Sequence, residues 1–318
     1  MVSVIVPNYN HGTFLQQRIT TILKQTYQDF ELLLLDDNSP DKSLEIIYKY
    51  AEHPKVSQII VNEVNSGSSI SQWKKGIQAA SGEYIWIAES DDYAAPDLLE
   101  NLVPLLESDD AIALAYAQSK QVDEKGDIIK NMIEEVRNIS DRWERPFVND
   151  GIDELKNYFC LINTIPNASG VVFRKSVAIE FIEEMNTFRN FKLVGDKMFW
   201  TNMLLRGKVA FCPKPLNYFR KHTNNVRSQS SSKQNLIDNF KWYAYLRSKV
   251  DIPKSRHIMV RNRLFGWWFG LGANPANYFY ANNCELRKES SSVFPFNGWL
   301  FFYLFLRFRI SALLNIFS

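Results

Sequence analysis

Residues 81–92 read SGEYIWIAESDD, an apolar run that ends in an acidic one. The aromatic and β-branched residues at 84–88 predict a short buried β-strand. Adjacent carboxylates at the end of a buried strand repel each other and lose solvation, so a cation or hydrogen-bond donors must offset them. Mg²⁺ and Mn²⁺ are commonly held by one or two carboxylates together with substrate phosphate oxygens. The stretch therefore predicts a divalent-metal site for a diphosphate, with a solvated acidic turn before Pro96 as the alternative.

The pattern around this strand predicts an α/β fold with a mostly parallel sheet flanked by helices. Further strand-like runs, each separated from the next by a helix-length segment, lie at 2–6, 30–35, 56–61 and 112–116. In open α/β sheets ligands bind outside the carboxyl ends of the strands. The runs at 2–6, 30–35 and 84–88 continue into polar segments, at 8–12, 36–39 and 89–92. We expect these three segments to meet at one edge of the sheet.

The alternation becomes irregular between residues 117 and 157 and then resumes. Strands are predicted at 170–174, 208–211 and 216–219, with a helix at 196–205 and a polar loop at 223–234. These elements complete a first domain of residues 1–225. Residues 226–318 are predicted to form a helical C-terminal appendage, which begins with a helix at 235–263.

The appendage is basic and rich in aromatic residues. It holds 13 Lys and Arg against 4 Asp and Glu, although the whole chain has a net charge of only +2. No nucleic-acid-binding module is recognisable, so an anionic membrane surface suits this charge better than nucleic acid. The apolar run 299–317 contains Arg307 and Arg309, which oppose membrane insertion. We expect this run to lie on a membrane, or else to pack on the protein itself.

The N-terminus and the cysteines predict a cytoplasmic protein, placed at the inner face of the membrane if the appendage binds lipid. The chain begins with a strand-like run and no signal-peptide pattern. Its three cysteines lack the spacing of a disulfide framework or a zinc site.

Glycine-rich phosphate-binding motifs are absent from the sequence. No GxGxxG follows the first strand and no GxxxxGK[ST] occurs, which argues against a Rossmann dehydrogenase and a P-loop enzyme. The charge of a bound phosphate must then be neutralised by metal. An acidic residue after the second strand, Asp36 or Asp37, can accept hydrogen bonds from a base or a ribose. The alternative is that this residue does no more than cap the following helix.

Three motifs together resemble those of the family 2 glycosyltransferases: VSVIVPNYN at 2–10, DDNS at 36–39 and SGEYIWIAESDD at 81–92. The resemblance covers about residues 1–225. It implies the GT-A fold, a nucleotide-diphosphate-sugar donor, a divalent cation (Mn²⁺ or Mg²⁺) and inversion at the anomeric carbon.

The resemblance also assigns roles at the strand ends. Pro7 and Tyr9 would line the nucleoside pocket, and Asp37 would bind the base. Asp91 would contact the ribose or the metal, and Asp92 would ligate the metal directly. Each has a structural alternative, because Pro7 can simply end a strand and Tyr9 can form an apolar wall.

Asp196 matches the acidic motif that supplies the catalytic base, although Gly195 stands where relatives usually carry Glu. A carboxylate is needed there to take the proton of the acceptor hydroxyl. The alternative is that Asp196 only caps a helix. The motif around His222 resembles the family's terminal motif, in which this His completes the metal site and Arg220 faces the diphosphate.

Two further contacts are predicted on weaker matches. Relatives often carry Arg-Asn before the glycine at position 76, whereas this chain has Trp73, Lys74 and Lys75. A cation from Lys74, or else from Lys75, is therefore assigned to the nucleotide phosphates. Trp73 can equally be a core residue. Ser169, just before a strand, is assigned to the donor sugar or the acceptor.

The predicted function is metal-dependent, inverting transfer of a sugar from a nucleotide-diphosphate-sugar, with a UDP-sugar preferred. The acceptor would be a glycan or a lipid-linked molecule in polysaccharide biosynthesis of the cell envelope. One alternative is a sugar-phosphate nucleotidyltransferase, which would be expected to carry a basic glycine-rich loop after the first strand. The other is a non-catalytic carbohydrate-binding or scaffold protein, against which the retained Asp37, Asp92, Asp196 and His222 argue.

Overall fold

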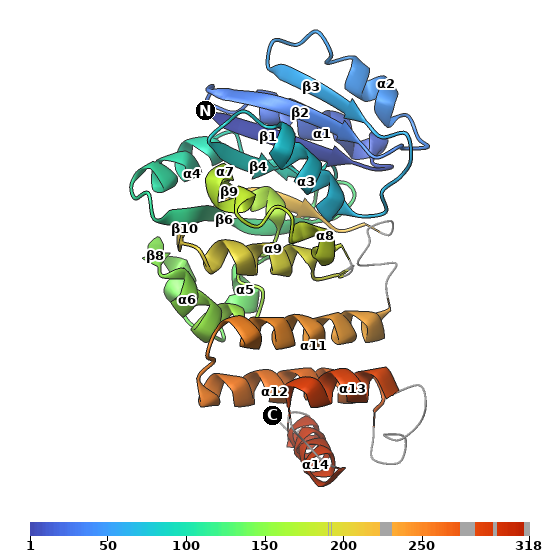
Figure 1. Cartoon of the computed structure of the whole chain (residues 1–318), viewed down its shortest axis with the longest axis vertical. Coiled ribbons are helices and arrows are strands. Elements are labelled where there is room, and N and C mark those ends of the chain that lie inside the picture. The colour runs from blue at the N-terminus through green and yellow to red at the C-terminus, as the bar shows by residue number, and fades with distance from the viewer. Residues whose placement is uncertain (190, 192, 223–230, 274–283, 295–297, 315–318) are drawn as a thin grey trace.

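The computed structural model describes residues 1–189, 191, 193–222, 231–273, 284–294 and 298–314 (Figure 1). The strands are β1 (Val2–Asn8), β2 (Phe30–Asp36), β3 (Val56–Val61), β4 (Tyr84–Ile87), β5 (Tyr93–Ala94), β6 (Ile112–Val122), β7 (Ile128–Asn131), β8 (Phe147–Asn149), β9 (Val171–Arg174) and β10 (Lys208–Arg220). The longer helices are α1 (Gly12–Leu23), α3 (Ser69–Ala79), α4 (Leu98–Glu107), α9 (Gly195–Leu204), α11 (Ser232–Lys249), α12 (Lys254–Gly270), α13 (Cys284–Val293) and α14 (Gly298–Leu314).

Shorter helical segments connect these elements. They are α2 (Ser43–Tyr48), α5 (Ile133–Val136), α6 (Gly151–Glu154), α7 (Lys175–Ile179), α8 (Met185–Phe188), η1 (Arg142–Glu144), η2 (Leu155–Phe159) and η3 (Ala168–Gly170). The loop predicted at 223–234 falls mainly on residues outside those described.

All ten strands of the described part of the chain belong to one sheet, whose main order is β3-β2-β1-β4-β9-β6-β10-β5. β1 is parallel to β2 and β4, and β10 is parallel to β6. β9 runs antiparallel between β4 and β6. The predicted α/β fold with a mostly parallel sheet is therefore confirmed, and each predicted strand is found. The predicted runs at 208–211 and 216–219 form one irregular strand, β10.

Alternating side chains of the central strands fill two separate cores, one on each face of the sheet. Val2, Val4 and Val6 of β1 pack with α1, α2 and α4 on one face. Ile5 points to the other face, where α3, α8 and α9 pack. Burial on both faces explains why these strands are almost wholly apolar until they end. Polar residues can therefore begin only at the edge where the strands stop.

Helix α3 packs unusually close to β1. A Cβ atom on Gly76 would clash with the side chain of Ile5, so only glycine lets the two backbones approach this far. The close packing brings Gln72 and Trp73 of α3 toward the ends of β2 and β4.

Helix α11 packs against α9, α12 and α13 pack against α11, and α14 packs against α12. Figure 1 shows α11, α12 and α14 at increasing distance from the sheet. Trp242 of α11 donates its indole N–H to Thr201 of α9 at 3.1 Å. The helix predicted at 235–263 is in fact two helices, α11 and α12. The break falls before Pro253, because proline disfavours helical backbone in the preceding residue.

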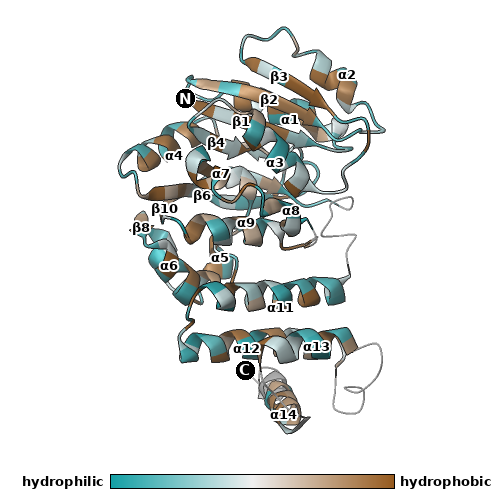
Figure 2. Ribbon diagram, viewed as in Figure 1, coloured by the Kyte–Doolittle hydropathy of each residue, from teal (hydrophilic) through white to brown (hydrophobic). Residues whose placement is uncertain are grey.

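One face of α14 packs on α12. Phe301 is 1% exposed and its ring centroid lies 5.1 Å from that of Phe269. The other face is apolar and exposed, including Phe302 at 42% and Leu306 at 42%, and Figure 2 shows brown residues along this helix. Among the described residues, no helix combines the length and apolarity needed to cross a bilayer.

Candidate active site

The carboxyl ends of β1 and β2 are joined by side-chain hydrogen bonds. Asn8 donates to Oδ2 of Asp36 at 2.8 Å, and the Ser39 backbone N–H donates to Oδ1 of Asp36 at 2.8 Å. Asp36 is fully buried and holds the turn after β2. Of the two adjacent aspartates, Asp36 is therefore the structural one.

Asp37 faces a different set of partners, beside an open pocket. Its carboxylate accepts hydrogen bonds from the Ser66 backbone N–H at 2.9 Å, the Ser66 hydroxyl at 2.7 Å and Gln72 at 2.8 Å. Ser66 and Gln72 also line a solvent-open pocket with an empty volume of about 790 Å³. Tyr9, just beyond β1, is 47% exposed, whereas Pro7 is buried within the strand. Tyr9 is thus free to stack on a ligand, and the nucleoside contact of the buried Pro7 stays a prediction.

A candidate metal centre forms where the loop after β4 meets the end of β10. His222 Nε2 lies 2.9 Å from Asp91 Oδ2, and the His11 and His222 rings are 5.3 Å apart between centroids. The ligand atoms of His11, Asp91 and His222 all lie within 4.8 Å of one another. His11 was not predicted, although it follows the first strand at the same edge as the other motifs.

The donor set of this centre suits Mn²⁺ or a similar divalent ion, because imidazole and carboxylate are common ligands for such ions. Burial lowers the pKa of His11, which favours the neutral imidazole that binds metal. Burial alone would raise the pKa of Asp91, but the hydrogen bond from His222 and the nearby imidazoles bring it below its ordinary value. Asp91 is therefore an ionised carboxylate between two imidazoles.

Asp92 points to a different group of residues. Its Oδ2 accepts the Ser169 hydroxyl at 2.6 Å, and its Oδ1 accepts the Arg220 backbone N–H at 2.9 Å. Burial and the charge of Asp91 raise the pKa of Asp92 to about 7. The three-residue cluster contains Asp91 and not Asp92, so direct metal ligation by Asp92 stays a prediction.

Ser169 and Arg220 support the acidic loop in this structure. Ser169 is 0% exposed, and its contact with a sugar stays a prediction. The Arg220 guanidinium donates to the backbone oxygens of Asp91 at 2.9 Å and Glu124 at 2.8 Å, and to Gln17 at 2.7 Å. Phosphate contact by Arg220 stays a prediction, because most of its donors are engaged in holding loops together.

Lys74 lies in a salt bridge with Glu183, at 2.9 Å, and donates to Asn186 at 3.2 Å. Its predicted contact with phosphate would require that ion pair to open. Lys75, the neighbouring lysine, is exposed and lines the pocket beside Asp37. Of the two candidate lysines, Lys75 is therefore the one next to the predicted nucleoside pocket, and phosphate contact by either stays a prediction.

A buried arginine lies beneath the acidic loop. Arg18 of α1 is 0% exposed, and its guanidinium carbon sits 4.9 Å from the centroid of the Trp86 ring. Its side-chain nitrogens have no hydrogen-bond partner among the described residues. Burial lowers the pKa of Arg18 to about 10, opposed by Asp92, Glu89 and Asp91. The burial of Arg18 could have been predicted from the sequence, because Arg18 lies on the face of α1 that otherwise carries the buried apolar residues Leu15, Ile19 and Ile22.

Trp73 links the acidic loop to the helix that carries Asp196. Its indole N–H donates to Glu89 at 2.8 Å, and its ring packs on Phe199 at 5.5 Å between centroids. Trp73 is 2% exposed, so it is a core residue that also holds a site residue. Burial, with the charge of Asp91, raises the pKa of Glu89 to about 8.

Asp196 lies in the first turn of α9 and does not cap it. The N-cap position is Val194, and Asp196 accepts a hydrogen bond from the Lys197 N–H at 2.8 Å. Asn163 Nδ2 lies 3.5 Å from the other carboxylate oxygen. A Cβ atom on Gly195 would lie 2.9 Å from Ile70, so a larger residue there would require the Ile70 side chain to move. The carboxylate of Asp196 is partly exposed.

Comparisons with known proteins identify the family and the fold. Residues 3–158 match the sequence profile described as Glycosyl transferase family 2. An uncharacterized glycosyltransferase of Haemophilus influenzae is 28% identical over 235 residues, which cover 74% of this chain and 70% of that protein. The chondroitin synthase of Pasteurella multocida is 33% identical over 132 residues, which cover 41% of this chain and only 13% of the synthase.

Two solved structures share the fold over most of the chain. The crystal structure of Staphylococcus aureus TarS residues 1–349 with UDP-GlcNAc has a TM-score of 0.67 and 17% identity, covering 92% of this chain and 81% of that one. The mannosyltransferase PcManGT of Pyrobaculum calidifontis, with GDP-Man and Mn²⁺, has a TM-score of 0.58 and 14% identity, covering 99% and 86%. The chain belongs to glycosyl transferase family 2 and has a GT-A-type fold.

Proposed function

We propose that this glycosyltransferase moves a sugar, with inversion, from a nucleotide-diphosphate-sugar to a glycan or lipid-linked acceptor in polysaccharide biosynthesis. The observation that carries the proposal is the meeting of His11, Asp91 and His222 at the sheet edge that also holds Asp37. The resemblance to chondroitin synthase supports the polysaccharide setting, and the fold shared with TarS in complex with UDP-GlcNAc favours a UDP-sugar.

Separate residues of the site would bind the nucleoside and the divalent ion. Asp37 and Tyr9 would hold the nucleoside beside the open pocket. His11, Asp91 and His222 would hold the divalent ion, which when bound neutralises the diphosphate. Asp92 would act mainly as the buried support of this loop, through Ser169.

Asp196 would serve as the catalytic base. The acceptor oxygen forms a bond to the anomeric carbon while the bond from that carbon to the diphosphate oxygen breaks, and the nucleoside diphosphate leaves. The carboxylate of Asp196 takes the proton of the acceptor hydroxyl. Attack opposite the leaving group inverts the anomeric configuration.

The outer face of α14 supports a second proposal, contact with an anionic membrane at the cytoplasmic face. Exposed Phe302, Tyr303 and Leu306 share the helix with exposed Arg307 and Arg309. Exposed aromatic and aliphatic side chains flanked by arginine are typical of helices that lie in a lipid interface. Such contact would bring the enzyme to a lipid-linked acceptor.

Calorimetric titration of UDP into the purified protein, with and without Mn²⁺, tests the donor proposal. We expect binding that depends on Mn²⁺ and that is lost in Asp91→Asn. Failure of UDP, GDP, dTDP and CMP to bind in either condition would favour a non-catalytic protein. Binding of a sugar 1-phosphate and a nucleoside triphosphate, with release of pyrophosphate, would instead indicate a nucleotidyltransferase.

A further inference from the structure

His11, a member of the candidate metal centre, stands at the beginning of helix α1. It is the N-cap residue, and its backbone oxygen accepts the N–H groups of Phe14 at 2.9 Å and Leu15 at 3.0 Å. An N-cap residue usually turns its side chain back to an N–H of the first turn. The His11 side chain makes no such bond, and its Nδ1 lies 2.9 Å from the Ser90 hydroxyl instead. The first turn of α1 therefore needs a partner from another segment.

Asp41, from the segment between β2 and α2, is that partner. Its Oδ2 accepts the Gly12 N–H at 2.8 Å, and its Oδ1 accepts the Ser43 N–H at 3.0 Å. The contact is close, because a Cβ atom on Gly12 would lie 2.9 Å from the same Oδ2 atom. Gly12 does not have a positive φ, so the glycine is needed here for space and not for its conformation. A carboxylate at this end of a helix also interacts favourably with the helix dipole.

Ser39 fastens the residue on the other side of His11. Its hydroxyl accepts the Asn10 N–H at 2.9 Å and donates to Oδ2 of Asp36 at 2.7 Å. Asn10 has a φ of 59°, in the left-handed region that asparagine tolerates better than most residues. The residues on both sides of His11 are thus bonded to one segment, the segment that follows β2.

The backbone position of His11 decides where its ring can reach. The ligand atoms of His11, Asp91 and His222 lie within 4.8 Å of one another, although they come from the start of α1, the loop after β4 and the end of β10. A ligand that is held in place before the ion arrives loses less conformational freedom on binding. Residues that orient a metal ligand from behind commonly change metal affinity by about 10–100-fold.

We propose that Asp41 is a positioning residue of the metal centre, which caps α1 in place of His11 and so leaves the imidazole available to the divalent ion. The inference rests on the proposed metal-dependent transfer. The segment after β2, which carries the predicted nucleoside residue Asp37, then also sets the geometry of the metal centre.

The nucleoside contact itself does not depend on Asp41. Although Asp37 belongs to the same segment, its carboxylate is held by Ser66 at 2.7 Å and Gln72 at 2.8 Å, both from beyond β3. Loss of Asp41 should therefore weaken the binding of metal and leave the metal-free affinity for UDP unchanged. A residue that only stabilises the fold would not separate these two affinities.

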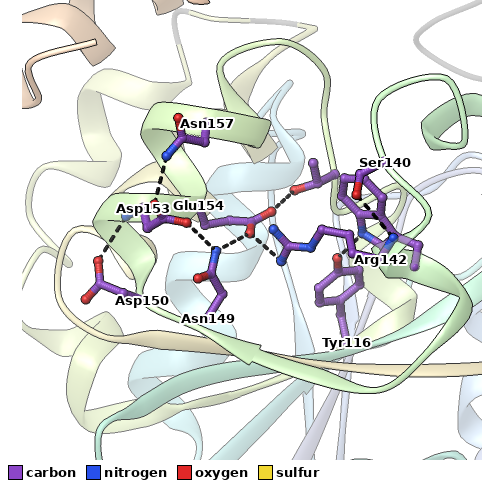
Figure 3. Close-up of polar contacts among 10 residues, drawn as sticks. Tyr116, Ser140, Arg142, Asn149, Asp150, Asp153, Glu154 and Asn157 are labelled. Carbon is purple, nitrogen blue, oxygen red and sulfur yellow. Dashed lines mark hydrogen bonds and ion pairs between the residues drawn. The ribbon is translucent and has the colours of Figure 1, made fainter. Parts of the chain in front are cut away.

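Calorimetric titration of Mn²⁺ into the full chain, in the presence of saturating UDP, tests the proposal. Asp41→Ala removes both acceptor atoms, and Asp41→Asn keeps one. Asp150→Ala is the matched control, because Asp150 caps α6 by accepting the Asp153 N–H at 2.9 Å (Figure 3) and lies outside the metal cluster. Thermal melting should show a similar small loss of stability in both alanine variants, since each loses one helix cap.

Gly12→Ala tests the same contact from the opposite side. The added methyl group would displace the Asp41 carboxylate, whereas alanine is otherwise the better helix former. Gly12→Ala should therefore lower Mn²⁺ affinity as Asp41→Ala does. In the double variant the losses should not add, because both substitutions remove one contact.

We expect the Kd for Mn²⁺ to rise by about tenfold in Asp41→Ala and in Gly12→Ala, and by less in Asp41→Asn. It should stay within about twofold of the wild-type value in Asp150→Ala, and the metal-free Kd for UDP should stay within about twofold in every variant. If Asp41→Ala does not fold, Gly12→Ala and Asp41→Asn decide.

Unchanged Mn²⁺ affinity in both Asp41→Ala and Gly12→Ala, additive losses in the double variant, or an equal loss in Asp150→Ala would each overturn the positioning role. Wild-type protein that binds UDP but not Mn²⁺ would remove the metal centre, and this role with it. Wild-type protein that binds neither would contradict the proposed transfer function itself.

Discussion

Replacement of His11 by Asn tests the metal centre most directly. The His11 ring lies 5.3 Å from that of His222, and its ligand atom is within 4.8 Å of those of Asp91 and His222. Loss of a single supporting residue around a metal typically lowers affinity by about 10–100-fold, and loss of a direct ligand belongs at the upper end. We therefore expect the Kd for Mn²⁺ to rise by roughly 100-fold, which equals about 2.8 kcal/mol at about 1.4 kcal/mol per tenfold.

Ser90→Ala is a second test of the same metal centre, with a smaller expected effect. The Ser90 hydroxyl lies 2.9 Å from Nδ1 of His11 and orients the ring without belonging to the cluster itself. We expect Mn²⁺ affinity to fall by roughly tenfold in this variant, since it removes only an orienting partner. The structure thus predicts an order of effects, with His11→Asn larger than Ser90→Ala.

The assay is calorimetric titration of Mn²⁺ in the presence of saturating UDP, at pH 7.5. His53→Asn is the matched control, because His53 lies between α2 and β3 and contacts the Lys55 N–H at 3.2 Å, outside the cluster. Thermal melting of each variant shows whether the fold is retained. If His11→Asn binds Mn²⁺ within twofold of His53→Asn, His11 is not a ligand and the three-residue centre is wrong.

Three further outcomes follow from the site. Asp196→Asn should leave UDP affinity unchanged and lower transfer by at least about 100-fold; near-normal transfer would disqualify Asp196 as the base. In metal-free protein the folded-state pKa values of Glu89 (about 8) and Asp92 (about 7) lie above those of the unfolded chain. The stability that these two groups provide is therefore complete at acidic pH and is lost as pH rises through 7 and 8. Glu89→Gln should flatten this dependence of Tm on pH, and an unchanged slope would contradict the assignment of the dependence to Glu89. Phe302→Ser with Leu306→Ser should release the protein from phosphatidylserine-containing liposomes without uncovering Phe301; retained binding would place the membrane contact elsewhere.

Strand positions and the sheet edge that carries the site were predictable from the sequence. The strands around Ile5 and Leu34 are buried on both faces, so their residues form apolar runs whose ends mark where polar side chains begin. Parallel pairing of β1, β2 and β4 then brings those ends together. Motif order was sufficient to predict that Asp37 and Asp91 lie at this edge, and the role of Asp196 stays a prediction.

Which of two neighbouring polar residues joins the candidate metal centre was not predictable. Asp91 and Asp92 are adjacent, yet one contacts His222 and the other contacts Ser169 from a segment 77 residues away. Arg220 matched a phosphate-binding motif, but its guanidinium is engaged by backbone oxygens of the Asp91 and Glu124 loops. Such choices depend on which partners arrive from distant parts of the chain.

The sequence by itself determined the alternation of strands and helices and the acidic character of the sheet edge, because both arise from local patterns of apolar and charged residues. Only the tertiary structure decided that His11 joins Asp91 and His222, that Ile70 lies against Gly195, and that Asn163 lies beside Asp196. Each of these depends on distances between segments far apart in the chain. Those distances are set by how closely helices pack on the sheet, which no local pattern encodes.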